Sequence, residues 1–289
     1  KAAISGGAIH THRDVTINAS NNIIFEDNKL TATNATYGGG IDSHANVTLD
    51  AGNNLIATGN TAGQQISGGS KPANAGGGFI SAYKDVTLEA SNKFEVSNNK
   101  AKGYGGAIYG ESVTIVNKVK GDDSEFSGNV SEREGGAIHI AGGAFVLDTV
   151  SNITFKGNQA GVVDLANPIP SDGQQGEAVY LSGQGASAII SVASGQVVDF
   201  QDTFISDAKN GHTFTKKGKG IIVFRSGDSA DSSRINTFYG ETTVEDGEFR
   251  LMDKAAFGGK QGASYSNPTT FTLKVGSSLT GEGTIIANT

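Results

Sequence analysis

The 289-residue sequence contains no cysteine, no tryptophan and only four prolines. The absence of cysteine excludes a disulfide scaffold, a thiolate metal site and a cysteine nucleophile. It also suits a chain that must stay unfolded while it crosses an oxidising periplasm, where disulfides would form too early. No stretch is long and apolar enough for a membrane-spanning helix, and the first residues show no signal-peptide pattern. We therefore expect a mature fragment of a larger exported protein.

The chain also lacks a surplus of basic residues. Lysine and arginine together number 22 against 29 aspartates and glutamates, which gives a formal net charge of −7. This acidic balance disfavours nucleic acid and anionic lipid as partners of the whole surface, although it permits local basic patches. A helical period is absent over any useful length. Glycine, in contrast, is abundant, with 42 residues.

A glycine doublet followed by small or apolar residues recurs through the first two thirds of the chain. The copies are Gly6-Gly7-Ala8-Ile9, Gly38-Gly39-Gly40-Ile41, Gly76-Gly77-Gly78-Phe79, Gly105-Gly106-Ala107-Ile108 and Gly135-Gly136-Ala137-Ile138. A degenerate sixth copy follows at Gly176-Glu177-Ala178-Val179. Such self-similarity predicts stacked repeats that bury their apolar faces against one another.

Two further short strands follow each doublet in a fixed order. The second strand is β-branched: Val15-Thr16-Ile17, Val47-Thr48-Leu49, Val86-Thr87-Leu88, Val113-Thr114-Ile115 and Phe145-Val146-Leu147. The third ends in asparagine, as in Phe25-Glu26-Asp27-Asn28 and Phe126-Ser127-Gly128-Asn129. Three strands per repeat, separated by turn residues, predict one triangular rung. The predicted fold class is all-β, a right-handed three-faced parallel β-helix, with the handedness resting on the general preference for right-handed crossovers and on the family resemblance described below.

Asparagines at equivalent turns predict hydrogen-bonded ladders along the stack. The predicted structural ladder after the third strand is Asn28, Asn60, Asn98, Asn129 and Asn158. A second set precedes that strand: Asn22, Asn54, Asn92, Asp123 and Asn152. In the third repeat Glu95 falls where the other repeats have Phe or Ala, unless a bulge turns Phe94 inward instead.

The pairing of Gly-Gly-Ala-Ile with Phe-x-x-Asn over residues 3–180 resembles the repeat of the chlamydial polymorphic membrane proteins, which also occurs in enterobacterial autotransporters. Residues 240–251 and 273–285 are similar to the C-terminal passenger rungs of autotransporters. We therefore divide the chain into a repeat β-helix over residues 1–180 and autotransporter-type rungs over 181–289, continuous with the first part. Cysteine is common in the chlamydial repeats, so its absence favours the enterobacterial relatives, among them the UpaB-type adhesins.

The resemblance implies a secreted passenger displayed on the bacterial cell surface, at the outer membrane. It implies contact with the membrane only through a C-terminal barrel missing from this chain, and adhesion as the usual role.

A carbohydrate-active enzyme is an alternative, because the β-helix also hosts pectin-degrading lyases and glycosidases. Those enzymes need clustered carboxylates on one strand face, often with Ca²⁺ or a catalytic histidine nearby. Asp122-Asp123, Gly211-His212 and Arg234-Ile235-Asn236 are scattered fragments of such signatures. Gly227-Asp228-Ser229 is similar to the nucleophile segment of secreted serine proteases, but Ala230 follows where a second glycine is expected. We therefore predict no catalysis and no cofactor.

Three histidines raise the question of a metal site. His10 and His12 are two residues apart in the first repeat, and His44 is equivalent to His12 one rung later. Stacked strands about 4.8 Å apart bring such side chains close enough for shared coordination. The alternative is a set of solvated, outward histidines, and because only Asp42 offers a further ligand we predict no metal.

Lysines gather in two places on the acidic chain. The candidates for ligand binding are Lys100, Lys102, Lys118 and Lys120 in the third and fourth repeats, and Lys209, Lys216, Lys217 and Lys219 further on. Lysines spaced on a rigid surface predict binding of sulfated polysaccharide through several weak, salt-sensitive contacts. The alternative is that both runs are solvated loops.

A column of polar residues opens the second strand of successive repeats: Asp14, Asn46 and Asp85, with Arg13 and Lys84 beside them. An extended protein partner could bind along such an evenly spaced face. The segments between the asparagine ladder and the next doublet differ in length, and two long ones, 61–75 and 159–175, flank the short ones of the third and fourth rungs. Loops on a rigid scaffold often carry recognition, although tolerated insertions without a role are an equal alternative.

The sequence thus predicts a surface adhesin that binds a host extracellular matrix glycoprotein of the fibronectin kind, a glycosaminoglycan, or both. The alternatives are a structural stalk, a self-associating passenger that promotes aggregation or biofilm, and the carbohydrate-active enzyme.

Overall fold

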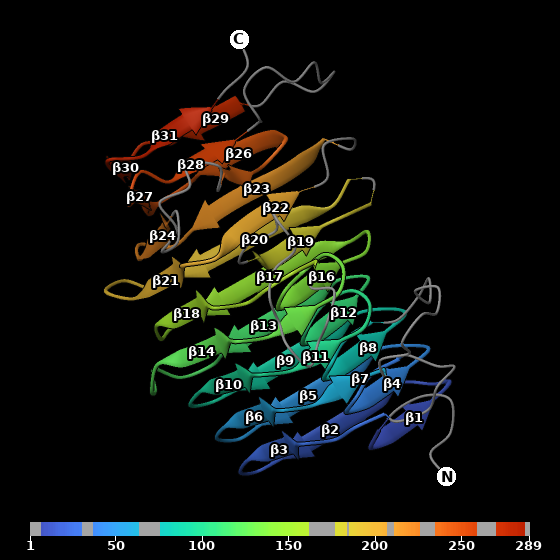
Figure 1. The fold of residues 1–289 in the computed structure, drawn as a ribbon. Coiled ribbons are helices and arrows are strands. Elements are labelled where there is room, and N and C mark those ends of the chain that lie inside the picture. Colours follow the sequence, from blue (N-terminus) through green and yellow to red (C-terminus); the bar gives the residue numbers. More distant parts are fainter. Residues whose placement is uncertain are drawn as a thin grey trace.

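The computed structural model describes residues 7–30, 37–63, 76–161, 177–183, 185–206, 211–225, 235–258 and 270–286. These residues form 31 strands. All strand pairs between them are parallel, and each strand pairs with its equivalent one turn of the chain away. Figure 1 shows the result as an elongated stack, with the N-terminal rungs at one end and the C-terminal rungs at the other. The predicted parallel β-helix is confirmed.

Three long sheets form the sides of the stack. Sheet A contains β1 (Ile9–Thr11), β4 (Ile41–Ser43), β8 (Ile80–Ala82), β12 (Ile108–Gly110), β16 (Ile138–Ile140), β19 (Glu177–Leu181) and β22 (Thr203–Ser206). Sheet B contains β2 (Val15–Ala19), β5 (Val47–Ala51), β9 (Val86–Ala90), β13 (Val113–Asn117), β17 (Ala144–Thr149), β20 (Ser187–Val192), β23 (His212–Lys217), β26 (Gly240–Val244) and β29 (Thr270–Leu273). Sheet C contains β3 (Ile23–Glu26), β6 (Leu55–Thr58), β10 (Phe94–Ser97), β14 (Ser124–Ser127), β18 (Ile153–Lys156), β21 (Val197–Phe200), β24 (Ile221–Arg225), β27 (Gly247–Met252) and β30 (Ser277–Gly281).

Two short sheets complete the rungs. The corner after sheet C carries β7 (Thr61–Ala62), β11 (Lys100–Ala101) and β15 (Val130–Ser131). In the last rungs β25 (Ile235–Thr237), β28 (Ala256–Gly258) and β31 (Thr284–Ile286) follow on from sheet A, with β25 beside β22. Sheets B and C run without interruption past residue 180, so the two predicted parts of the chain share one stack. In the described part of the chain no helix is long and apolar enough to cross a membrane.

The core is a column of inward-facing apolar side chains. In β5, Val47, Leu49 and Ala51 are fully buried, whereas Thr48 and Asp50 between them face outward. Aromatic rings stack from rung to rung: Phe126, Phe155, Phe200 and Phe224 follow one another at centroid distances of 4.9, 4.7 and 5.1 Å. These distances match the spacing of paired strands, about 4.8 Å, so in-register pairing itself brings the rings into contact.

The glycine doublets allow neighbouring rungs to approach at one corner. Gly105 has a φ of +60°, a conformation that side chains rarely adopt. A Cβ at Gly106 would lie 2.0 Å from the carbonyl oxygen of Gly136 in the next rung. The first glycine therefore makes the turn and the second makes room for the rung above. The register pairs Ile41 with Ile80, so Phe79 is equivalent to Gly40 and not, as the sequence alignment assumed, to Ile41.

The asparagine ladder forms, with one correction. Asn28, Asn60, Asn129 and Asn158 lie in it as predicted, but the third rung contributes Asn99 and not Asn98. The side chain of Asn98 is exposed and its φ is +56°. Asp202 extends the ladder by accepting hydrogen bonds from Asn158.

The cause of this correction is the register of β10. Val96 pairs with Ala57 and with Phe126, so Val96 occupies the inward Phe position and Asn99 follows three residues later. Glu95 faces outward, and the pairing of β10 is continuous, so the bulge offered as an alternative does not occur. The sequence interpretation had shifted the third repeat by one residue.

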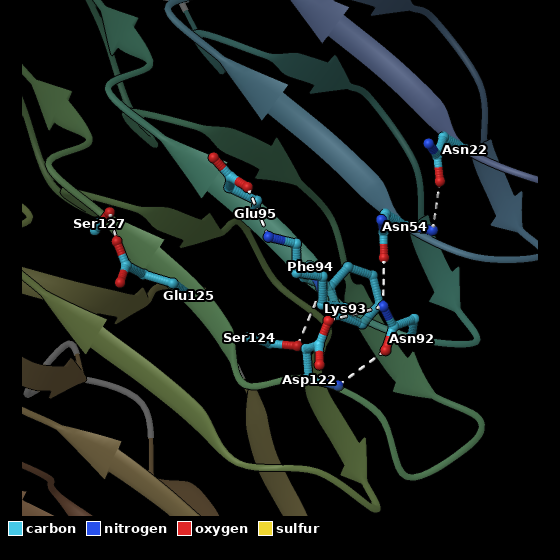
Figure 2. A network of polar contacts seen from close by, with 10 residues as sticks. All are labelled: Asn22, Asn54, Asn92, Lys93, Phe94, Glu95, Asp122, Ser124, Glu125 and Ser127. Atoms are coloured by element: carbon cyan, nitrogen blue, oxygen red, sulfur yellow. Dashed lines mark hydrogen bonds and ion pairs between the residues drawn. The ribbon is translucent and has the colours of Figure 1, made fainter.

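The second polar set stacks differently from the expected order. Figure 2 shows Asn54 accepting a hydrogen bond from Asn92, which in turn contacts Asp122. Asp123 accepts a hydrogen bond from Asn152 on the other side. The set therefore splits into two hydrogen-bonded groups. Asp122 bonds to Asn92 in the preceding rung, and Asp123 bonds to Asn152 in the following rung.

Candidate binding surfaces

The structure separates the predicted lysines into different environments. Lys102 and Lys216 are buried, at 6% and 0% exposure. Lys118 forms ion pairs with Asp50 at 2.8 Å and Glu89 at 2.6 Å, so its charge is compensated on sheet B. Lys120, Lys217 and Lys219 are exposed, Lys100 is half-buried, and Lys209 lies outside the described residues. Among the described lysines, Lys102 and Lys216 are thus withdrawn from the surface, and polysaccharide binding by the exposed ones stays a prediction.

Lys216 is a structural residue. It faces inward at the end of β23, and its Nζ donates hydrogen bonds to the carbonyl oxygens of Lys217 at 2.8 Å, Gly218 at 2.6 Å and Asp246 at 3.1 Å. Burial lowers the pKa of Lys216 to about 8, while the charge of Asp246 acts in the opposite direction. The ammonium group thus satisfies three carbonyl oxygens where two rungs turn from sheet B to sheet C.

Lys216→Met is expected to lower the free energy of unfolding by about 1–3 kcal/mol, because buried carbonyl oxygens lose their donor. Lys217→Met, at the next and exposed position, is expected to change it by about 0.5 kcal/mol or less. Urea unfolding of both variants measures the difference. Equal stability of the two variants would contradict the structural role of Lys216.

The polar column at the start of sheet B has the predicted form. Asp14 Oδ1 accepts hydrogen bonds from the backbone and the side-chain nitrogen of Asn46, both at 3.0 Å. Asn46 Oδ1 accepts one from the backbone nitrogen of Asp85 at 3.2 Å. All three residues are exposed, so the column offers two carboxylates on either side of an amide. Lys84 is paired with Glu111 of the next rung at 3.3 Å.

Beside this column the three histidines cluster, as their spacing predicted. Nδ1 of His12 lies 2.7 Å from Nδ1 of His44, and Nδ1 of His10 lies 2.8 Å from Oδ2 of the buried Asp42. The ring of His44 stacks on Tyr83 with an interplanar angle of 5°. Within the described ranges, no group of three or more ligand side chains has the geometry to hold a metal ion. The cluster is a packed aromatic column at the corner between sheets A and B.

A second aromatic column lies on the outward face of sheet A, over β12, β16 and β19. The register places Tyr109, His139 and Tyr180 side by side. The ring of His139 stacks on Tyr109 at 5.5 Å and on Tyr180 at 5.4 Å. Between these tyrosines His139 is almost fully buried, and burial lowers its pKa to about 3.

Tyr104 and Arg133 extend this column at the corner of the third and fourth rungs. The ring of Tyr104 lies 4.6 Å from that of His139, and the guanidinium carbon of Arg133 lies 5.0 Å above the Tyr104 ring. Arg133 Nη1 also donates a hydrogen bond to the hydroxyl of Tyr104 at 2.6 Å. In the part of the chain that the structure describes, Arg133 forms no ion pair.

This aromatic column was not among the predicted site residues. The sequence carries a signal for it, because Tyr109, His139 and Tyr180 each follow the apolar residue that ends the glycine-doublet motif. The two long segments that were expected to flank this surface lie mostly outside the described residues.

A buried carboxyl group lies close to the same corner. Glu177 Oε1 accepts a hydrogen bond from the backbone nitrogen of Gly135, and its side chain is enclosed. Burial raises the pKa of Glu177 to about 8, and the negative charge of Glu134 raises it further, whereas the Gly135 hydrogen bond acts to lower it. Glu177 is therefore mostly protonated at neutral pH and adds little negative charge to the corner.

Comparison with known proteins agrees with this repeat architecture. The Chlamydia polymorphic membrane protein repeat matches residues 93–111 and 123–141. The chain is 31% identical over 161 residues to the probable outer membrane protein pmp20 of Chlamydia pneumoniae, covering 56% of this chain and 9% of the relative. It is 27% identical over 228 residues to the probable outer membrane protein pmp6 of the same organism, covering 76% of this chain and 17% of the relative. No solved structure matches the chain. The chain therefore spans a small part of the length of the relatives it matches.

Proposed function

We propose that the chain is part of the passenger of a bacterial autotransporter and acts as an adhesin for host extracellular matrix glycoprotein, glycosaminoglycan, or both. The repeats support the coarser part of this proposal, since they match those of chlamydial outer membrane proteins. The same relatives support a location at the bacterial cell surface, in the outer membrane. The adhesive role is the more specific part of the proposal, and it follows the role of enterobacterial adhesins with similar repeats.

The observation that carries the adhesive role is the exposed column of Asp14, Asn46 and Asp85. Its side chains are held in line by hydrogen bonds from rung to rung, so their charges are preorganised before a partner arrives. The rungs repeat at about 4.8 Å, so the column offers evenly spaced polar groups along which an extended segment of a glycoprotein could bind. A stalk would need no such alignment of exposed carboxylates.

Binding without catalysis is also part of the proposal. A serine and a histidine do meet, since Ser182 Oγ lies 3.0 Å from His139 Nε2. However, the same hydroxyl donates a hydrogen bond to the carbonyl oxygen of Ile140 at 2.9 Å. His139 is buried between two tyrosines, and its lowered pKa makes it a weak base. This pair fits a structural role in the aromatic column better than activation of a nucleophile.

The test is binding to immobilised fibronectin and heparin before and after neutralising the column. Asp14→Asn with Asp85→Asn keeps the hydrogen-bonded ladder but removes both charges, and we expect at least tenfold weaker binding to fibronectin with an unchanged melting temperature. Asp148→Asn, at an exposed position on sheet B, is the control and should bind like wild type. Wild-type binding by the double variant would exclude the column. Failure of the unmodified chain to bind any matrix protein or glycan would favour the stalk.

A further inference from the structure

The corner of the third and fourth rungs holds an arginine, Arg133, that is fixed in position and has no ion pair among the residues that the structure describes. A guanidinium group has five N–H donors, and Arg133 uses one of them, toward the Tyr104 hydroxyl. The guanidinium group also lies over the ring of Tyr104. Arg133 is half-buried, so its remaining donors stay near the surface.

The acidic groups around Arg133 do not compete for it in the described structure. The ion pairs between described residues do not join Arg133 to Glu132, which is buried, or to Glu134, its neighbour in the chain. Glu177 is enclosed and bound to the backbone of Gly135. This contrasts with Arg225 and Arg250 on sheet C, which are paired with Asp199 at 2.9 Å and with Glu248 at 2.7 Å. Among the described residues, Arg133 is thus a cation held in place without a carboxylate partner.

The aromatic column next to Arg133 provides the second half of a recognition surface. Tyr109, His139 and Tyr180 cover two rung intervals, about 10 Å in all. This length is similar to that of a disaccharide. Tyrosine rings supply apolar contact area at a low cost in conformational entropy. The two tyrosines are held in place by the buried ring of His139, which stacks on both.

The arrangement points to a ligand with a planar anionic group beside an apolar face. An arginine fork binds a carboxylate through two parallel hydrogen bonds, and such pairs are stronger and more directional than those of lysine. A sugar ring that carries a carboxylate combines this group with the C–H face that packs on a tyrosine. Both uronic acid residues of glycosaminoglycans and sialic acid residues of glycoproteins have this chemistry.

We propose that Arg133, Tyr104 and the Tyr109–His139–Tyr180 column form a subsite for a carboxylated sugar residue of a host glycan. The guanidinium binds the carboxylate, Tyr104 holds the guanidinium in place, and the tyrosine column packs against the adjoining sugar. This subsite rests on the proposed adhesive function and gives it a site and a ligand class. It differs from the lysine hypothesis, because recognition here depends on a carboxylate and not on sulfate.

The experiment measures binding of the purified chain to hyaluronan oligosaccharides, which carry carboxylates but no sulfate, and to sialyllactose. Carboxyl-reduced hyaluronan and lactose serve as the uncharged counterparts. We expect the chain to bind one of the two carboxylated ligands, with an affinity at least tenfold higher than for its uncharged counterpart. Preference for hyaluronan would identify a uronate ligand, and preference for sialyllactose a sialate ligand. Equal binding of the carboxylated and uncharged forms would overturn the proposal.

Substitutions at the corner test the individual roles. Arg133→Gln should weaken binding at least tenfold, and Arg133→Lys should not restore it fully, because an ammonium group lacks the fork. Tyr104→Phe keeps the ring but removes the hydroxyl that holds Arg133, so an intermediate loss is expected. Arg250→Gln, which removes a paired arginine on sheet C, is the matched control and should bind like wild type. Circular dichroism and melting temperature show whether each variant is folded.

The outcomes also separate this subsite from the general function. If the chain binds neither hyaluronan nor sialyllactose, but binds fibronectin, or binds heparin equally well before and after carboxyl reduction of the heparin, the subsite is wrong and the adhesive function stands. If it binds none of the four ligands, both fail. If the folded Arg133→Gln variant binds the carboxylated ligand as wild type does, the carboxylate is recognised elsewhere and the assignment of this corner is wrong.

Discussion

Replacing Asn99 by glycine is expected to be among the most destabilising single substitutions in this chain. The side chain of Asn99 is fully buried, and it donates to the carbonyl oxygen of Ala57 and to Asn129 Oδ1, both at 2.9 Å. Its Oδ1 accepts from the backbone nitrogen of Asn60 at 3.1 Å and from Asn60 Nδ2 at 2.9 Å. Removing it leaves buried groups in two neighbouring rungs without partners, at a cost of about 1–3 kcal/mol each.

Asn98→Gly is the matched control, because it makes the same chemical change one residue away. Asn98 is exposed and already has a positive φ, which glycine adopts without strain. We expect its melting temperature to stay within a few degrees of wild type, while that of Asn99→Gly falls sharply. Thermal unfolding monitored by circular dichroism measures both. A larger loss for Asn98→Gly than for Asn99→Gly would reverse the assignment of the ladder.

The sequence was sufficient to predict the architecture because each rung repeats the same short sequence motifs. Glycine doublets, β-branched strands and terminal asparagines recur in the same order, and parallel in-register stacking follows from burying their apolar positions. Sequence spacing could not determine the register of the third repeat to within one residue. In the third repeat, Val96 replaces the phenylalanine that marks the inward position, and two asparagines follow it. Only the pairing of β10 with its neighbours decides that Asn99 faces inward.

The site residues were harder to predict, because the direction of a side chain depends on the alternation within its strand. Lys216 lies in a run of basic residues, yet it occupies an inward position of β23 and points into the corner between two rungs. Conversely, Tyr104 and Arg133 stand 29 residues apart and meet only because their corners stack. Composition detects a run of charge, but it cannot tell a buried cation from a solvated one or a paired cation from an unpaired one.

The pKa of His139 is lowered and that of Glu177 is raised, and these opposite shifts make the stability of this part of the stack depend on pH. For His139, a folded pKa of about 3 lies below the ordinary value of 6.5, so its contribution to stability is lost as pH falls between these values. For Glu177, a folded pKa of about 8 lies above the ordinary value of 4.5, so its contribution is fully present below pH 4.5 and lost as pH rises toward 8. Between pH 4.5 and 6.5 the two slopes oppose each other, and above pH 6.5 the slope of Glu177 remains.

Glu177→Gln is therefore expected to stabilise the protein near neutral pH and to change little at pH 4.5. Glutamine keeps the carbonyl oxygen that accepts the hydrogen bond from Gly135 but cannot ionise in the enclosed site. The difference in free energy of unfolding between variant and wild type should grow by up to about 1.4 kcal/mol per pH unit above 4.5, reaching at most about 3 kcal/mol near pH 7. Urea unfolding at pH 4.5, 6, 7 and 8 measures this difference and cancels the contribution of His139, which both proteins share.

The control for this prediction is Glu111→Gln, which removes an exposed carboxylate paired with Lys84. Its effect on stability should be small and nearly independent of pH over the same range, because exposed ion pairs contribute about 0–1 kcal/mol. A Glu177→Gln variant whose stability differs from wild type by a constant amount from pH 4.5 to 8 would show that Glu177 has an ordinary pKa. It would then carry a negative charge at neutral pH at its hydrogen bond with Gly135, two residues after Arg133 in the chain, and the corner of the third and fourth rungs would be less favourable for an anionic ligand.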